Sequence, residues 1–380
     1  MIDNIIELRK QLHQYPEISG QETHTALRIQ EFINKHHPPK RWITKLGGTG
    51  IAAVYEFPGE GPVVAVRCEL DALPIRETNI FPHRSKNQNV SHKCGHDGHM
   101  AIVAGLVYRL RSKPPKKGAV ILLFQPAEET GKGAPSVLED PQFTGLAIDY
   151  IFALHNIPGV PMHTIITMDR TFSAEVISFS LALKGKESHA AEPEQGINPA
   201  LCISELIADL EKLNKTDPND SNFTILTPVH INLGQKAYGV SPGYGELHYT
   251  LRTWSSDQME NLITEIKKKI NSICTQYHVS FELSWFEHFP SSKNHSLCNT
   301  LVKDAAKTLG LFIQEMPYPF RFGEDFGWYS KKYKTAMFGL GSGEQTPALH
   351  HADYDFPDEL LETGIDMFVS ILTMILTSDE

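Results

Sequence analysis

Cysteine is scarce in this chain of 380 residues, and its five cysteines stand singly, at positions 68, 94, 202, 274 and 298. An odd and sparse set does not make a disulfide framework, and Cys94 has no nearby partner for thiol redox chemistry. No apolar run approaches the roughly 18 residues that span a bilayer. The start, Met1–Asn4, lacks the basic and apolar regions of a signal peptide. We therefore expect a soluble, cytoplasmic protein without membrane segments.

Positive charge is also in short supply. The chain has 35 Lys and Arg but 45 Asp and Glu, which gives a net charge of -10. A nucleic-acid partner is disfavoured, because phosphate binding needs Lys and Arg clustered on one face. The short runs Lys267–Lys269 and Lys331–Lys332 are more typical of solvated surfaces. With 41% hydrophobic residues, the chain is long enough for two globular domains.

The first half of the chain predicts an α/β fold. Apolar residues at helical spacing predict helices, and short continuous apolar runs predict buried strands. A helix between two such strands is typical of a mixed, largely parallel sheet flanked by helices. The predicted helices cover residues 3–14, 22–35 and 98–111, and the strands cover residues 63–66, 119–124 and 150–154.

From about residue 175 the pattern changes to β-α-β-β-α-β, the split ferredoxin-like order. The elements are strands at 176–183, 223–233, 244–253 and 279–286, with helices at 198–213 and 257–277. After Pro290 the chain returns to a helix at 296–309, a strand at 335–340 and a helix at 358–376. We therefore predict a smaller α+β domain, residues 175–289, inserted into a larger one made of residues 1–174 and 290–380.

The segment Cys94-Gly-His-Asp-Gly-His99 places a thiol, a carboxylate and two imidazoles within six residues. Thiolate and imidazole are ligands for zinc, manganese, cobalt or nickel. The alternative is that Cys94 is a small buried hydrophobic residue and that the histidines are ordinary core or surface residues. A structural zinc finger would need further paired ligands at short spacing. If this segment binds metal, its other ligands come from distant parts of the chain.

Polar residues follow each predicted buried strand. Glu69 and Asp71 follow the first, Glu128–Glu129 the second, and His155 the third. Ligands of open α/β sheets bind outside the carboxyl ends of the strands, so we expect these side chains to share one crevice. The alternatives are a solvated pair of acids and a neutral structural histidine. With His350, just before the last helix, these residues offer enough ligands for two divalent ions.

Seven segments carry a resemblance to a known family. They occur in the order RCELDALPI (67–75), KCGHDGHM (93–100), FQPAEETGKGA (124–134), ALHNIPG (153–159), SHAAEPEQGINP (188–199), FGEDFGWY (322–329) and LHHADY (349–354). Together they resemble the di-metal amidohydrolases of the aminoacylase and carboxypeptidase type. The branch that looks most similar contains auxin-conjugate hydrolases, hippurate hydrolases and N-acyl-amino acid deacetylases.

The resemblance implies roles for particular residues. It implies that Glu128 is the general base and that the inserted domain forms a lid and a homodimer surface, with His189 of this lid polarising the scissile carbonyl. Asp71 would orient a ligand from outside the metal shell, and Asp97 and His99 would support it. Asn198 and Arg252 are candidates for the substrate carboxylate, against the alternatives of a helix cap and a surface salt bridge. The implied metal ligands, with Cys94 as the bridge, are Cys94, His96, Glu129, His155 and His350.

Three positions depart from the family pattern. Members usually carry Ala where Lys93 stands and Asp where Glu69 stands. The lid segment usually reads Asn-Val-Ile-Pro-Asp, whereas residues 239–243 read Gly-Val-Ser-Pro-Gly. None of these differences removes an implied ligand.

The expected activity is hydrolysis of the amide bond of an N-acyl amino acid, or a similar small amide, with two divalent ions per subunit. One alternative is a di-metal exopeptidase for dipeptides, which shares the chemistry and differs in the pocket. Another is a binding protein that kept the fold and lost catalysis, although the intact Glu128 and five ligands argue against it. The partners expected are the small substrate and a second copy of the chain, with no nucleic acid or membrane.

Overall fold

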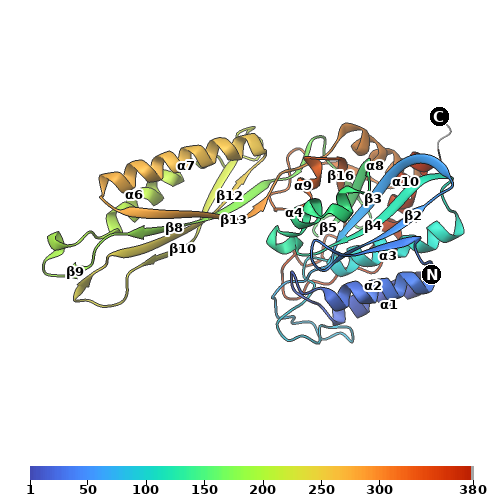
Figure 1. Cartoon of the computed structure of the whole chain (residues 1–380), viewed down its shortest axis with the longest axis horizontal. Coiled ribbons are helices and arrows are strands. Elements are labelled where there is room, and N and C mark those ends of the chain that lie inside the picture. Colours follow the sequence, from blue (N-terminus) through green and yellow to red (C-terminus); the bar gives the residue numbers. More distant parts are fainter. Residues whose placement is uncertain (378–380) are drawn as a thin grey trace. The chain divides into compact units, whose positions relative to one another are not determined.

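The computed structural model describes residues 1–377 and divides into two compact units (Figure 1). The larger unit contains Met1–Phe172, Ser292–Pro317 and the chain from Glu324 on, and the smaller contains Ser173–Ser291 and Tyr318–Gly323. The smaller unit thus extends two residues beyond the predicted insert at each end. It also includes Tyr318–Gly323, which the sequence assigned to the larger domain. This segment belongs there because Phe320 O accepts a hydrogen bond from Ala174 N at 2.8 Å.

The larger unit is built on an eight-stranded sheet of order β1-β2-β4-β3-β5-β16-β6-β15. The pairs β4–β3, β3–β5, β5–β16 and β6–β15 are parallel, while β1–β2, β2–β4 and β16–β6 are antiparallel. The mixed, largely parallel sheet predicted from the sequence is confirmed. The strands are β1 (Arg41–Leu46), β2 (Gly50–Glu56), β3 (Gly59–Glu69), β4 (Lys117–Gln125), β5 (Tyr150–Ile157), β6 (Ile165–Thr167), β15 (Ile313–Glu315) and β16 (Lys334–Gly341).

Five helices of the larger unit share one apolar core with the sheet. In four of them the apolar residues recur at helical spacing and present a single buried face, whereas the fifth, at His96–Ser112, is buried on nearly all sides from His96 to Val107. They are α1 (Ile2–Gln14), α2 (Thr23–His36), α3 (His96–Ser112), α8 (Ser296–Thr308) and α10 (Leu360–Leu376). Shorter helices are α4 (Gly133–Glu139), α5 (Pro141–Thr144), α9 (Gly327–Ser330) and the 3-10 turn η1 (Glu128–Thr130).

The smaller unit has a four-stranded antiparallel sheet of order β10-β12-β8-β13. Helices α6 and α7 cover one face of it (Figure 1). This confirms the ferredoxin-like arrangement that the β-α-β-β-α-β order predicted. The elements are β8 (Glu175–Lys184), α6 (Ala200–Glu211), β10 (Thr224–Leu233), β12 (Tyr244–Thr253), α7 (Ser256–Gln276) and β13 (Ser280–Phe289).

Short elements complete the two units. Strands β7 (Thr171–Ser173) and β14 (Ser292–Lys293) pair with each other, and so do β9 (Ser188–His189) and β11 (Val240–Ser241). A 3-10 turn, η2, covers Pro193–Gln195. Among the described residues, no helix is long and apolar enough to cross a membrane.

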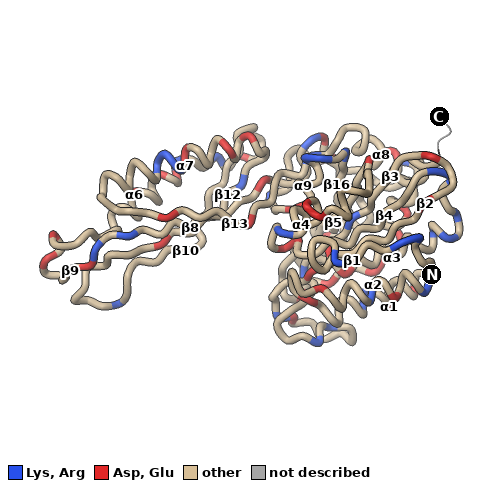
Figure 2. The backbone as a smooth tube through the Cα atoms, viewed as in Figure 1, with Lys and Arg blue, Asp and Glu red and all other residues tan. Residues whose placement is uncertain are grey.

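The parallel strands β3, β4 and β5 end at the same edge of the sheet. Glu69 is paired with Gln125 in the register of β3 and β4, and β5 lies on the other side of β3. Figure 2 shows acidic segments gathered near the labels of α4 and β5 in the larger unit. The polar residues that follow these strands are therefore brought to one edge, as the sequence predicted.

Candidate metal centre

The Cys94–His96 segment reaches this edge from the start of α3. Gly95 adopts the left-handed conformation, with φ of 94°, and a Cβ there would overlap the side-chain amide of Asn156. Only glycine fits such a position without strain. The turn directs Cys94 Sγ to 3.5 Å from Nε2 of His155, which belongs to β5. Ligand atoms of Cys94, His96 and His155, all buried, lie within 4.8 Å of one another.

A second triad shares Cys94 with the first. Ligand atoms of Cys94, Glu129 and His350 also lie within 4.8 Å of one another. Glu129 bridges the two sets, because its Oε1 is 3.8 Å from His96 Nε2 and its Oε2 is 3.8 Å from His350 Nε2. All five residues that the family resemblance implied as ligands therefore lie in one cluster.

The hydrogen bonds of this cluster fit divalent cations. His96 Nδ1 lies 2.8 Å from Asp71 O, and His155 Nδ1 lies 2.9 Å from Asn156 O. Each ring therefore has its tautomer fixed and turns Nε2 toward the cluster, as metal-binding histidines do. His96 Nε2 and Glu129 Oε1 are buried and have no hydrogen-bond partner. A thiolate, imidazoles and a carboxylate form a donor set for zinc, manganese, cobalt or nickel.

Burial dominates the electrostatics of the cluster. It raises the pKa of Glu129 to about 7 and lowers the pKa of His155 to about 3. It also raises the pKa of Glu128 well above its ordinary value, with further contributions from the charges of Glu324 and Glu129. Buried acids without a cation carry a desolvation cost, which a bound divalent ion offsets.

Glu128 shares His96 Nε2 with Glu129 as a neighbour but differs in its other partner. Its Oε1 accepts a hydrogen bond from Asp325 N at 3.4 Å, and its Oε2 is 3.9 Å from His96 Nε2. The sequence predicted extended or irregular backbone here, whereas the two residues form the 3-10 turn η1; their carboxylates still differ in their second partner, Asp325 N for Glu128 and His350 for Glu129, so they are available for different tasks. Both were singled out from the sequence for this reason.

A buried charge network beside Glu128 was not predicted. The guanidinium of Arg67, on β3, pairs with Glu69, with Glu324 at 3.0 Å and with Asp325 at 2.6 Å. Gln125 joins the network through Arg67 Nε at 2.9 Å. The signal was present, because Arg67 and the Glu324–Asp325 pair both lie inside segments that carry the family resemblance. Arg67 and Asp325 are 258 positions apart in the sequence, and no local pattern predicts a contact over that separation.

Asp71 contacts the ligand Glu129, and the ring of His99 lies 4.9 Å from that of His155 between centroids; His99 also forms a further possible metal-binding group with Glu69 and His96. Asp71 Oδ2 accepts hydrogen bonds from Ser19 Oγ at 2.6 Å and from Glu129 N at 2.9 Å. His99 Nδ1 lies 2.7 Å from Glu69 Oε2, and its Nε2 lies 2.6 Å from Asn156 Oδ1. Both are placed to position ligands, Asp71 through the backbone N–H of Glu129 and His99 through its contact with the ring of His155.

Three predicted residues belong to the smaller unit. His189 lies on β9, where its Nδ1 accepts a hydrogen bond from Ala191 N at 3.0 Å. Asn198 stands one residue before Pro199, the N-cap of α6; its Oδ1 accepts from Ala200 N at 2.9 Å and its Nδ2 donates to Ser241 Oγ at 3.2 Å. Arg252 Nη1 donates to Arg321 O at 2.7 Å. The substrate contacts predicted for these residues stay predictions.

Comparison with known proteins finds one matching family model and similar relatives. The family model described as peptidase family M20/M25/M40 matches residues 65–374. An N-acetylcysteine deacetylase of Bacillus subtilis (strain 168) is 29% identical over 376 residues, covering 98% of this chain and 97% of the relative. An N-acetyl-L-cysteine deacetylase of the same strain is 34% identical over 330 residues, covering 86% and 77%.

Two solved structures are similar to this chain over nearly its full length. The Bacillus subtilis YXEP protein, a dinuclear metal binding peptidase from the M20 family, is 26% identical with a TM-score of 0.85, covering 100% of this chain and 99% of its own. A putative aminohydrolase from methicillin-resistant Staphylococcus aureus gives a TM-score of 0.88 at 23% identity, with coverage of 99% and 97%. The latter supports the fold alone.

Proposed function

The chain belongs to the M20/M25/M40 peptidase family, and on that premise we propose that it hydrolyses the amide bond of small N-acyl amino acids. The family resemblance read from the sequence is confirmed, and with it a hydrolase that acts on amide bonds. The observation that carries the proposal is the convergence of the Cys94, Glu129 and His350 triad with the Cys94, His96 and His155 triad, next to Glu128. Two relatives named as deacetylases of N-acetylated cysteine support an N-acyl amino acid as substrate.

Each triad would hold one divalent ion, with Cys94 shared between them. Bound there, such ions supply Lewis-acid activation of water and of a carbonyl oxygen. The donor set suits zinc, manganese, cobalt and nickel alike. Refilling metal-stripped protein with each ion, and measuring both the bound metal and the turnover, identifies the ion that works best. A protein that binds none of these ions would contradict the proposal.

Glu128 moves the proton in the proposed reaction. Its carboxylate accepts a proton from the attacking water and delivers it to the leaving amide nitrogen, so that an acid and an amine are released. The Asp325 N–H, at 3.4 Å, and the Arg67 network behind it fix the position of this carboxylate. Glu129 faces the imidazoles of His96 and His350, each at 3.8 Å, so it is placed as a ligand rather than as the base.

Glu128→Gln tests this assignment. The amide keeps the shape of the side chain but cannot take a proton, so we expect turnover to fall by at least about 10²-fold, the lower end of general-base contributions. Metal content should stay at the wild-type level. Glu139→Gln, an exposed change on α4, is the matched control. Normal turnover in Glu128→Gln would remove Glu128 from the mechanism.

Substrate class is tested with a panel of amides. Acetylated, benzoylated and indole-acylated amino acids are compared with unblocked dipeptides, using metal-refilled protein. We expect kcat/KM to be higher for the acylated amino acids. A preference for dipeptides would instead make the chain an exopeptidase, and inactivity on every amide would favour a binding protein.

We propose that His189 donates a hydrogen bond to the substrate carbonyl. Because its Nδ1 accepts from Ala191 N, the neutral ring carries its proton on Nε2, which is then a donor. Loss of one such donor lowers turnover by about 10²–10³-fold. We therefore expect His189→Ala to lower kcat by that factor with bound metal unchanged, as elemental analysis would show. Unchanged kcat would contradict the role.

We propose a homodimer formed through the smaller unit. Strand β10 is at the edge of its sheet and exposes Val229, Ile231 and Leu233, with Val229 60% exposed. An edge strand with apolar side chains is typically covered by another chain. Ile231→Lys should convert a dimer to a monomer in light scattering, whereas Leu27→Lys, at an exposed leucine of α2, should not. A monomeric wild-type protein would contradict this proposal.

A further inference from the structure

Lys93 is a completely buried lysine beside the shared ligand Cys94. Its exposed fraction is 0%, and it is among the largest fully buried side chains of the described residues. Lysine is almost never fully buried unless it is paired. Its position is also one of the three departures from the family pattern, which has Ala there.

The side chain and backbone of Lys93 both contact the turn that carries His350. We call residues 349–354 the His350 turn. Lys93 O accepts a hydrogen bond from His350 N at 2.7 Å, and Lys93 Nζ donates to Tyr354 O at 2.7 Å. The turn is thus held at both ends by one residue. His350 has φ of 66°, a strained left-handed conformation that its surroundings must maintain.

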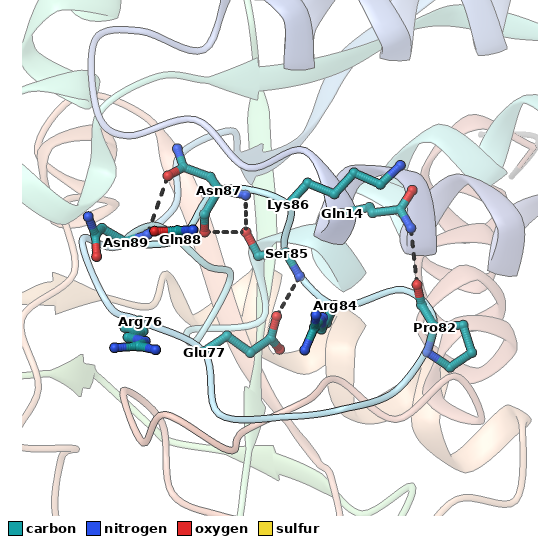
Figure 3. Close-up of a pocket in the computed structure, with 10 residues that line it drawn as sticks. All are labelled: Gln14, Arg76, Glu77, Pro82, Arg84, Ser85, Lys86, Asn87, Gln88 and Asn89. Atoms are coloured by element: carbon teal, nitrogen blue, oxygen red, sulfur yellow. Dashed lines mark hydrogen bonds between the residues drawn. The ribbon is translucent and has the colours of Figure 1, made fainter.

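The third contact of Lys93 is a carboxylate. Its Nζ lies 2.5 Å from Glu77 Oε1, and that carboxylate also contacts His13 Nε2 at 2.9 Å. Glu77 Oε2 accepts a hydrogen bond from Ser85 N, which closes the loop drawn in Figure 3. The carboxylate is therefore anchored, and it fixes the ammonium group between the loop and the His350 turn.

We infer that Lys93 is a positioning residue that sets His350 opposite Cys94 and Glu129, an inference that rests on the proposed metal centre. The ammonium joins three segments that are distant in sequence: the Glu77 loop, the Cys94 segment and the His350 turn. An alanine at position 93 keeps the backbone bond to His350 and loses the other two contacts. The chain therefore uses a charged side chain to hold a ligand that is itself 52% exposed.

The two metal triads should depend on Lys93 to different extents. Cys94, His96 and His155 are held by α3, by β5 and by hydrogen bonds to backbone oxygens. His350 depends on the turn that Lys93 holds. Loss of the ammonium should weaken the triad that contains His350 and leave the other intact.

Lys93→Met provides the test, because methionine retains the apolar stem and removes the three donors. Metal titration against a competing chelator measures the two dissociation constants for zinc. We expect the weaker-held second ion to lose about 10–100-fold in affinity, the usual cost of removing an outer contact of a ligand. The first ion should bind as in the wild type. In the metal-free variant, amide hydrogen exchange should become faster in residues 350–354.

Two further variants complete the experiment. Lys113→Met, at an exposed lysine after α3, is the matched control and should bind both ions normally. Glu77→Gln/Lys93→Met removes both buried charges, so it avoids leaving the Glu77 carboxylate without one of its two cationic partners, Lys93 and His13. The double variant should recover thermal stability relative to Lys93→Met while its second ion stays weakly bound.

The outcomes distinguish this inference from the proposed function. If the wild type binds two ions and Lys93→Met binds both equally well, with unchanged exchange in the His350 turn, the inference about Lys93 is overturned. Equal weakening of both ions would also overturn it, because that result indicates general loosening. A wild-type protein that binds no ion at all would overturn the metal centre itself.

Discussion

At the scale of single residues, the position of Glu129 depends on one carboxylate that is not itself a proposed ligand. Asp71 Oδ2 accepts from the backbone N–H of Glu129, and Asp71 O contacts the ring of His96. Asp71 therefore orients two proposed ligands, Glu129 and His96, that come from different segments. Outer contacts of this kind commonly decide metal affinity.

Asp71→Ala should lower the affinity for metal by about 10–100-fold, because Glu129 N loses the carboxylate that accepts its hydrogen bond, while His96 keeps its contact with the backbone O of residue 71. A chelator competition assay on the purified variant measures the change. Ser19→Ala removes only the hydroxyl that donates to Asp71, at 2.6 Å, and should cause a smaller loss. Equal affinity in Asp71→Ala and the wild type would show that Asp71 does not position the ligands.

His13 gives the larger unit a dependence on pH. Burial lowers its pKa, but Asp97, Glu77 and Asp355 together outweigh burial and raise the pKa from 6.5 to about 9. A group whose pKa is raised on folding stabilises the protein fully below pH 6.5, and this stabilisation is lost as pH rises through about 9. The difference corresponds to about 3 kcal/mol in the free energy of unfolding.

We expect the metal-free protein to lose stability between pH 6.5 and 9, measured by urea unfolding at a series of pH values. In His13→Gln that slope should be smaller, since the glutamine does not titrate, whereas the buried acids Glu128 and Glu129 still do. Metal-free protein is used so that proton release on metal binding does not contribute. Parallel profiles for the two proteins would contradict the assignment to His13.

The sequence indicated most of the candidate site because its residues follow recognisable segments. Cys94 and His96 stand in one short cluster, and Glu129 and His155 follow apolar runs that predict strands. The Arg67 contacts with Glu324 and Asp325, and those of Lys93 with Glu77 and Tyr354, were not predicted. These contacts join residues that no spacing rule relates, so only the folded chain reveals them.

At the scale of elements, α3 brings the Cys94 segment to the sheet edge by packing closely against the chain after the His350 turn. Gly98 lies in the first turn of α3, where a Cβ would overlap the ring of Phe356. The glycine permits the approach of the two segments. Its cost is the lower helix propensity of glycine, about 1 kcal/mol relative to alanine.

Gly98→Ala should destabilise the protein even though alanine favours helices. Overpacking against a buried ring costs about 1–3 kcal/mol, which exceeds the propensity gain. Urea unfolding of the metal-free variant measures the difference. In Gly145→Ala the new Cβ would lie 3.5 Å from Pro141 O, an ordinary contact, so that control should change little. A stabilised Gly98→Ala would mean that Phe356 moves aside freely.

Elements were predicted where a periodic pattern persists. Long helices such as α1, α7 and α10 and buried strands such as β4 follow directly from apolar spacing. The antiparallel pair β1–β2 was missed. Its register shifts between Thr44 and Leu46, with Lys45 at φ of 59°, so the alternation that marks a strand is interrupted.

At the scale of the whole molecule, all five proposed ligands belong to the larger unit, while each unit has its own apolar core. The chain passes between the units at residues 172–173, 291–292, 317–318 and 323–324. The last two crossings were not predicted, because Tyr318–Gly323 joins the smaller unit through residues far away in sequence: Phe320 O accepts from Ala174 N, and Tyr318 packs against the cluster of Ala174, Phe223 and Trp254.

Separate cores and a metal centre in one of them predict two thermal transitions with different metal dependence. A ligand that binds only the folded state stabilises it by about 4 kcal/mol at 1,000 times its dissociation constant. Calorimetry with increasing zinc should therefore raise one transition temperature and leave the other in place. Ile270→Ala, in the core of the smaller unit with 0% exposure, should lower only the metal-independent transition, because a buried cavity costs about 2–5 kcal/mol. If zinc raises both transitions together, or if Ile270→Ala lowers the metal-dependent one, the two units unfold as one cooperative structure.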